Sequence, residues 1–283
     1  MESISIITGG TGGIGYQAAL ALARSGGRVV VTGRNAERGA AAVEQLKADS
    51  GNPAVELAVA DLSTRAGTDA LADDLSRRFD RVDLLINSAG SMTQERTDTE
   101  DGYSLNFAVN VVAVHRLTLR LLPLLEAARP SRVVNVSGGI PTLGLDPKDV
   151  QAKQNFVPLM SYGRTKRAAD AMSIALGRKL APHGVFVNIA HPNLASTAMV
   201  GAMTPASMPW YMRIFWPLMK SSMHGDDGGK SAAKAARPIL HLATSEEVSE
   251  QYGLAFDPKL KPLKLHATVV NESNQALVIA AID

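Results

Sequence analysis

The stretch SISIITGGTGGIG, from Ser3 to Gly15, decides the fold that the sequence predicts. It begins as a run rich in β-branched residues, typical of a buried strand, and continues through five glycines. The residues that follow, Tyr16–Leu22, have the apolar spacing of a helix. The stretch therefore predicts a strand, a glycine-rich loop and a helix in direct succession.

This succession is typical of a loop that binds the pyrophosphate of a dinucleotide. A helix start offers unpaired backbone N–H groups and the positive end of its dipole, and glycines allow close approach. Two registers fit, the common G-x-G-x-x-G from Gly10 and a longer T-G-x-x-x-G-x-G from Thr8. We favour the second, because the strand is expected to end at Ile7. The candidate ligands in this loop are Gly9, Thr11, Gly13, Ile14 and Gly15.

Length and composition limit the class of protein. At 283 residues the chain can bury one large core, and we expect a single domain over residues 1–283. The formal net charge of +2 argues against nucleic acid as a partner. There is no cysteine, and the six histidines lack metal-binding spacing. We find no signal peptide and no run of about 18 apolar residues, so we expect a cytoplasmic protein without a transmembrane span.

The residues after the second predicted strand, Arg28–Thr32, indicate the cofactor. A site that prefers NAD usually has an acidic residue here to bind the ribose 2′-hydroxyl. This chain has Arg34 and Asn35 instead, with Arg38 one helical turn further on. A guanidinium binds a 2′-phosphate that a carboxylate would repel, so these residues predict NADP(H). The alternative is that both arginines are solvated surface charges.

Small and polar residues follow the next two predicted strands. The strand Val55–Ala60 leads to Asp61 and Leu62, where the carboxylate could accept a hydrogen bond from an adenine amine or cap a helix expected over 64–79. The apolar run from Asp83 predicts a strand buried on both faces, and its small C-terminal residues leave room for a ligand. The candidates there are Asn87, Ala89 and Gly90.

Two predicted helices carry the candidate catalytic side chains. A helix expected over residues 101–125 holds Asn110 among apolar neighbours, so its buried amide must find partners. A second helix, over about Leu159–Leu180, places Tyr162 and Lys166 on one face. A neighbouring ammonium stabilises phenolate, so the pair predicts a tyrosine pKa below the usual value of about 10. An exposed helix face is the alternative, and the position after a fifth strand argues against it.

The second half of the chain continues the alternation, with strands expected over Ser131–Val136 and Gly184–Ala190 and a last helix over about 268–282. Between them, residues 198–223 include six methionines and four aromatic residues. Such an adaptable apolar surface predicts a lid over a bulky hydrophobic substrate. Core or dimer contacts and shallow contact with a membrane surface are the alternatives.

Taken together, these residues resemble the short-chain dehydrogenase/reductase family over nearly the whole chain. The matching motifs stand in the family's order: T-G-x-x-x-G-x-G from Thr8, Asp61-Leu62, N-S-A-G from Asn87, Asn110, the strand into Ser137, Y-x-x-x-K from Tyr162, and Pro192 with Thr197. Arg34, the segment Thr99–Tyr103 and Pro209-Trp210 look like the branch of retinol dehydrogenases and protochlorophyllide reductases.

The resemblance implies an α/β fold, a doubly wound parallel sheet of about seven strands in the order 3-2-1-4-5-6-7 with helices on both faces. It implies one NADP-binding Rossmann domain with a substrate lid inserted at about 195–228. It also implies a homo-oligomer, although the apolar lid could instead keep the protein monomeric. Tyr162 would exchange a proton with the substrate, Lys166 would bind the nicotinamide ribose, and Asn110 would hold a water. The residues implied near the nicotinamide carboxamide are Pro192, Asn193, Leu194 and Thr197.

Two positions depart from the family pattern. Family members carry a serine that binds the reacting oxygen where this chain has Gly138. Ser137 stands one residue too early, and on a strand such a shift turns a side chain to the other face. We expect a loop distortion, Thr142 or the substrate itself to replace the missing hydroxyl. Asn193 stands where a glycine usually follows the proline, and its side chain could alter nicotinamide access.

We therefore expect an NADP(H)-dependent oxidoreductase that acts on a carbonyl or alcohol of a bulky hydrophobic small molecule, with Tyr162 as general acid and base. Two other hypotheses stay open. Gly138 suits a family member that catalyses a non-reductive cyclisation or isomerisation. The binding loop by itself suits a silent NADP(H)-binding module, although a pure binder has no need of the Tyr162–Lys166 pair.

Overall fold

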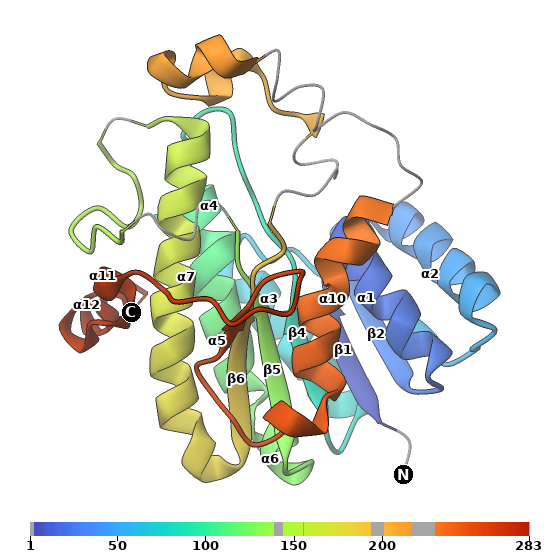
Figure 1. The fold of residues 1–283 in the computed structure, drawn as a ribbon. Coiled ribbons are helices and arrows are strands. Elements are labelled where there is room, and N and C mark those ends of the chain that lie inside the picture. The colour runs from blue at the N-terminus through green and yellow to red at the C-terminus, as the bar shows by residue number, and fades with distance from the viewer. Residues whose placement is uncertain (1–2, 139–143, 155, 194–200, 217–229, 283) are drawn as a thin grey trace.

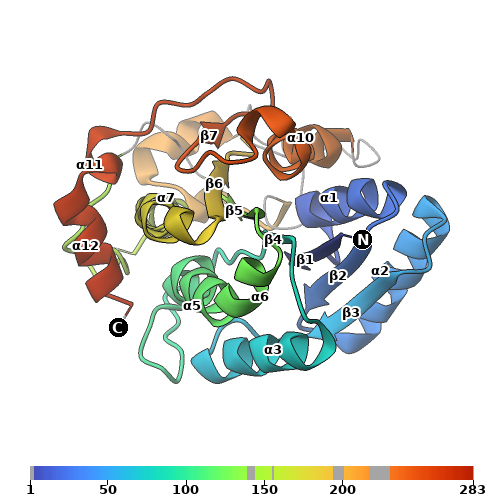
Figure 2. The ribbon, with the colours of Figure 1, turned by 90° about the horizontal axis from the view of Figure 1, so that it is seen from below.

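A computed structural model describes residues 3–138, 144–154, 156–193, 201–216 and 230–282. Seven parallel strands form one sheet in the order β3-β2-β1-β4-β5-β6-β7 (Figure 1 and Figure 2). The strands are β1 (Ile4–Thr8), β2 (Arg28–Gly33), β3 (Val55–Val59), β4 (Leu84–Asn87), β5 (Ser131–Val136), β6 (Val185–Ala190) and β7 (Ala255–Phe256). The fold class and strand order expected from the sequence are confirmed.

Helices cover both faces of the sheet (Figure 2). One face packs against α1 (Gly13–Arg24), α2 (Ala36–Ser50) and α10 (Lys230–Thr244). The other packs against α3 (Arg65–Arg78), α5 (Ala113–Arg120), α6 (Leu122–Ala127), α7 (Pro158–Leu180) and α12 (Glu272–Ala280). The shorter elements are α4 (Leu105–Phe107), η1 (Ala108–Val112), η2 (Ala181–His183), η3 (Pro205–Ser207), η4 (Trp210–Phe215), η5 (Glu246–Val248) and α11 (Ala267–Val270). Within the described ranges, no helix has the length and apolar character needed to cross a membrane.

The single helix expected over residues 101–125 is wrong in detail. It begins only at Leu105, because Gly102 adopts a left-handed φ of 80° in the preceding turn. Between α4 and α5 the backbone forms the π-helical turn η1 with Asn110 at its centre, a geometry found frequently at functional sites. The segment breaks again at Leu121, because Pro123 in the first turn of α6 lacks the N–H that would continue the preceding helix.

The C-terminal part of the chain also differs from expectation. The last helix divides at Asn271, because the Asn271 side chain accepts a hydrogen bond from the Asn274 N–H and starts α12 anew. Helix α10 is not predicted from the sequence above. Its buried aliphatic residues nevertheless recur at helical spacing: Ala232, Ala235, Ala236, Ile239 and Leu242.

The described part of the predicted lid, residues 201–216, lies above the carboxyl ends of the strands (Figure 1). Within it, Met203 and Met208 are buried. They form an apolar cluster whose partly buried members are Met92, Leu159, Met212 and Trp216. The described part of the lid therefore encloses an apolar interior, while the remainder of the predicted lid lies outside the described residues.

Phe107 is fully buried in the core on the α7 face of the sheet and packs near Tyr103. We expect Phe107→Ala to lower the free energy of unfolding by about 3–5 kcal/mol, because it leaves a cavity that its neighbours cannot fill. Guanidinium denaturation followed by circular dichroism measures this loss. Leu277→Ala on α12 is the control, since Leu277 is 50% exposed and its replacement should change stability by less than about 0.5 kcal/mol. Equal losses in both variants would contradict this assignment of the core.

Candidate active site

The glycine loop between β1 and α1 lies where β1 and β4 end. Gly9 and Gly13 have left-handed φ angles of 66° and 55°, which favour glycine. A Cβ atom on Gly9 would lie 2.8 Å from the Ala89 Cα, and one on Gly15 would lie 2.6 Å from the Gly9 carbonyl oxygen. These contacts show why the loop needs glycines in the longer T-G-x-x-x-G-x-G register.

Thr8 joins this loop to the end of β4. Strand β1 ends at Thr8, one residue later than predicted, and the Thr8 Oγ1 accepts hydrogen bonds from the backbone N–H groups of Ser88 and Ala89, each at 3.1 Å. The chain order of the strands reverses between β1 and β4, and doubly wound sheets bind ligands at this point. Thr8 therefore holds together the two sides of the expected binding crevice.

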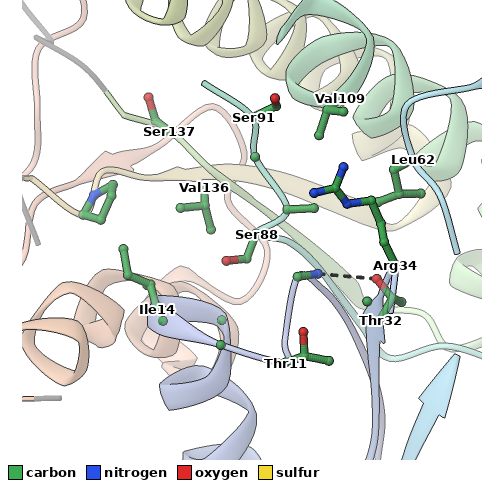
Figure 3. A pocket seen from close by; sticks show the side chains of 18 of the residues that line it. Thr11, Ile14, Thr32, Arg34, Leu62, Ser88, Ser91, Val109, Val136 and Ser137 are labelled. Carbon is green, nitrogen blue, oxygen red and sulfur yellow. Dashed lines mark hydrogen bonds between the residues drawn. The ribbon is translucent and has the colours of Figure 1, made fainter. Parts of the chain in front are cut away.

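A cavity of about 410 Å³ runs along this crevice (Figure 3). Its wall is built by the glycine loop, the ends of several strands and the face of α7. The candidates from the sequence that line it are Gly9, Thr11, Gly13, Ile14, Gly15, Arg34, Asp61, Leu62, Ala89, Gly90, Tyr162, Lys166, Pro192 and Asn193. Residues far apart in the sequence thus meet in one cavity large enough for a ligand.

Other candidates lie outside the cavity wall. The Asn35 side chain caps α2 by accepting a hydrogen bond from the Arg38 N–H at 2.8 Å, and the Arg38 side chain is exposed. Asn87 is buried and donates to the Asn135 side chain at 2.8 Å. The candidates that fall outside the described residues are Thr142, Leu194 and Thr197. Within the described ranges, no group of three or more metal-ligating side chains could hold a metal ion.

The cavity wall also contains residues that the sequence did not mark as ligands: Gly12, Thr32, Gly33, Ala60, Ser88, Ser91, Val109, Val136 and Ser137. Thr32 and Gly33 end β2, and Val136 ends β5. Since ligands bind at the carboxyl ends of parallel strands, strand position is the signal that would have identified most of them.

Arg34 and Asp61 belong to the part of the cavity wall that follows β2 and β3. Figure 3 shows the Arg34 side chain in this wall. Asp61 accepts a hydrogen bond from the Ser63 N–H at 2.9 Å. That hydrogen bond, together with the nearby Arg34 charge, holds the pKa of Asp61 below its usual value. The Arg34 guanidinium is exposed to the cavity and to solvent, so it can reach an anionic group bound there.

Asn110 joins the loop after β4 to α7. Its side chain accepts from the Ser91 N–H and donates to the Ser91 carbonyl and to the Thr165 hydroxyl, each at 2.9 Å. The buried amide is therefore satisfied, as its apolar surroundings require. These bonds place the Asn110 side chain in a positioning role, and the water implied by the family resemblance stays a prediction.

Tyr162 and Lys166 lie on the face of α7 that lines the cavity. The buried Lys166 ammonium donates to the Val136 carbonyl at 2.9 Å and lies 5.8 Å from the Tyr162 ring centroid. Burial lowers the pKa of Lys166 to about 8 and raises the pKa of Tyr162 to about 12. The expected lowering of the tyrosine pKa is therefore wrong for this structure, because desolvation by burial outweighs the lowering effect of the Arg167 charge.

Gly138 lies directly against the Tyr162 hydroxyl. A Cβ atom on Gly138 would lie 2.3 Å from the Tyr162 hydroxyl oxygen and 3.1 Å from Cζ. The phenol thus fills the space that a serine side chain at this position would need. Ser137 reaches the cavity wall, but its hydroxyl accepts a hydrogen bond from Arg167 Nη2 at 3.0 Å and is engaged within the protein.

A doubly wound parallel sheet with a glycine loop at its switch point defines the class, a Rossmann-type α/β protein. The sequence pattern of the short chain dehydrogenase family matches residues 3–207. Retinol dehydrogenase 13 of Homo sapiens is 33% identical over 259 residues, covering 89% of this chain and 75% of the relative. Polyprenol dehydrogenase of Mus musculus is 34% identical over 275 residues, covering 91% of this chain and 80% of the relative.

A solved structure agrees with these relatives. The Pseudomonas aeruginosa RhlG/NADP active-site complex has a TM-score of 0.67 and 26% identity, covering 90% of this chain and 94% of that one. The chain belongs to the short-chain dehydrogenase family, in its retinol-dehydrogenase-like branch. The resemblance stated from the sequence is confirmed.

Proposed function

We propose that this protein is an oxidoreductase that transfers hydride between NADP(H) and a carbonyl or alcohol of a bulky hydrophobic small molecule. The observation that carries the proposal is that one cavity holds the glycine loop, Arg34, Tyr162 and Lys166 together. The NADP complex of the related RhlG supports the choice of cofactor.

The cavity wall offers suitable contacts to the pyrophosphate, the 2′-phosphate and the nicotinamide ribose of NADP(H). A pyrophosphate can approach Gly9 and Gly15, where any Cβ would collide, beside the unpaired N–H groups at the start of α1. Arg34 would bind the 2′-phosphate, because a guanidinium forms forked hydrogen bonds with phosphate oxygens. Lys166 and Tyr162 line the other part of the wall and would hold the nicotinamide ribose. When bound, NADPH supplies the hydride that a carbonyl carbon accepts.

Tyr162 is the group that moves the proton. In reduction, its O–H donates a proton to the carbonyl oxygen while the carbonyl carbon accepts hydride, and an alcohol results. With a pKa of about 12 the phenol is protonated at neutral pH, so it is in the form that donates a proton during carbonyl reduction. Alcohol oxidation needs the phenolate, and its rate should therefore rise with pH.

The substrate class rests on the apolar character of the site. Val109 and Val136 line the cavity, and Met203 and Met208 are buried within the lid above the strand ends. Methionine side chains adapt to irregular apolar ligands. The relatives named for retinol and polyprenol support a hydrophobic alcohol or carbonyl as substrate.

Consumption of NADPH with a panel of lipophilic aldehydes, ketones and enones tests this proposal. We expect turnover with at least one apolar carbonyl and a preference for NADPH over NADH. Tight NADPH binding without turnover of any compound would contradict it. The second candidate, a non-reductive cyclisation or isomerisation, is favoured by Gly138 alone, and it would be supported if product formed equally with and without a coenzyme.

The cofactor assignment predicts a selective effect of Arg34. We expect Arg34→Gln to weaken NADPH binding by about 100-fold, because a charge-assisted contact with the 2′-phosphate is lost. NADH carries no such phosphate, so its affinity should stay within about twofold. Fluorescence titration measures both dissociation constants.

Arg38→Gln is the matched control for this titration, since Arg38 is exposed and lies outside the cavity wall. It should change NADPH affinity by less than about threefold, as expected of a screened surface charge. Equal weakening of NADPH and NADH in Arg34→Gln would show that Arg34 does not bind the 2′-phosphate.

A further inference from the structure

A buried ion pair lies on the same helix as Tyr162, and the proton transfer described above does not use it. Arg167 and Asp170 are 1% and 2% exposed, with Arg167 Nη2 and Asp170 Oδ2 3.0 Å apart. Two further guanidinium nitrogens of Arg167, Nε and Nη1, are buried without a hydrogen-bond partner in the described part of the chain. Buried charges with incomplete hydrogen bonding add little stability, so stability does not explain the pair.

The pair contacts the part of the cavity wall where the family's serine is missing. Arg167 Nη2 donates to the Gly138 carbonyl at 2.6 Å and to the Ser137 hydroxyl at 3.0 Å. Gly138 in turn lies against the Tyr162 hydroxyl. Arg167 therefore fixes the backbone segment that meets the reacting phenol.

We propose that the Arg167–Asp170 pair is a positioning unit for proton transfer by Tyr162. This role rests on the proposed function and extends it to two residues outside the cavity wall. Arg167 holds Gly138 against the phenol, and the two charges act on the phenol in opposite directions. The guanidinium favours phenolate, whereas the carboxylate favours the neutral phenol.

The electrostatics around the phenol agree with this assignment. Burial has the largest effect on the pKa of Tyr162 and raises it, Arg167 then lowers it, and Asp170 raises it. Burial, followed by Arg167, lowers the pKa of His191 to about 4, so that ring is neutral at physiological pH. The charged groups that act on Tyr162 are Arg167 and Asp170. Those that act on His191, which follows β6, are Arg167, Lys166 and Asp257. Arg164 on α7 is paired with Asp149 on the loop before this helix.

Direct titration of Tyr162 tests the proposal without any substrate. The chain has five tyrosines, so carbon-13 labelling at tyrosine Cζ gives few NMR signals, and Tyr162→Phe identifies the relevant one. With NADP⁺ bound, we expect Arg167→Met to move the titration upward and Asp170→Asn downward, each by about one pH unit. Arg167→Lys keeps the charge and should restore the wild-type titration. A merely structural role would not produce opposite shifts.

A double variant tests the proposal even if either single variant fails to fold. Arg167→Met with Asp170→Asn removes both charges, which buried sites tolerate better than one unpaired charge. Its titration should match the wild type, while kcat for carbonyl reduction falls about tenfold, because the Gly138 carbonyl has lost its donor. The KM for NADPH should stay within about twofold.

The two readouts separate this inference from the proposed function. Opposite titration shifts without turnover of any carbonyl would support the positioning unit and count against hydride transfer. Unchanged titrations in both single variants, or a double variant with wild-type kcat, would overturn the positioning unit.

Discussion

Replacement of Tyr162 with phenylalanine is expected to lower kcat for carbonyl reduction by about 10²–10⁴-fold, the range typical for loss of a general acid. The phenyl ring preserves the packing on α7, while the O–H that donates the proton is removed. NADPH affinity should change by less than about threefold, since most of the cavity wall stays intact. Steady-state kinetics with a hydrophobic carbonyl, together with fluorescence titration of NADPH, measures both quantities.

Tyr211→Phe is the matched control, because it also removes a phenol hydroxyl but does so at an exposed tyrosine on η4 of the lid. Its kcat should stay within about twofold of the wild type, as expected for an exposed side chain. If Tyr162→Phe kept wild-type kcat, another group would supply the proton and the proposed mechanism would fail.

Introduction of serine at position 138 is expected to lower kcat by about 100-fold, although family members carry a serine there. The reason is steric: the new Cβ would lie 2.3 Å from the Tyr162 hydroxyl oxygen, so the phenol must move away from its present position. A displacement of about 1 Å at a reacting group typically costs this much in rate. Gly138→Ala adds a Cβ atom without a hydroxyl. It should lower kcat equally, which would attribute the loss to the Cβ atom and not to the hydroxyl.

Gly163→Ala is the control for this experiment. Gly163 lies on α7 next to Tyr162, and a Cβ there would meet no atom within 4 Å. Its kcat should stay within about twofold of the wild type, since no neighbour has to move. A rise in kcat of Gly138→Ser would show that the phenol occupies a different position in the working enzyme, and would contradict the steric argument.

Local patterns in the sequence determined the succession of strands and helices and most of the residues of the cavity wall. The β-branched run before Gly9 and the helical spacing after Gly15 each depend on residues close in the chain, so a strand, loop and helix were predictable. The same holds for Arg34 after β2 and for Tyr162 with Lys166 on one helical face. The end of β1 was misplaced by only one residue.

Contacts between distant segments were decided by the tertiary structure alone. Lys166 donates to the Val136 carbonyl, 30 residues away, and the Gly138 backbone meets Tyr162 across two elements. The raised pKa of Tyr162 follows from burial, which no local spacing encodes. The sequence shows that position 138 is a glycine and carries no hydroxyl. Only the packing of β5 against α7 brings the Tyr162 hydroxyl against Gly138 and the Arg167 guanidinium onto the Gly138 carbonyl. Such contacts depend on how whole elements pack together and not on the residues within one of them.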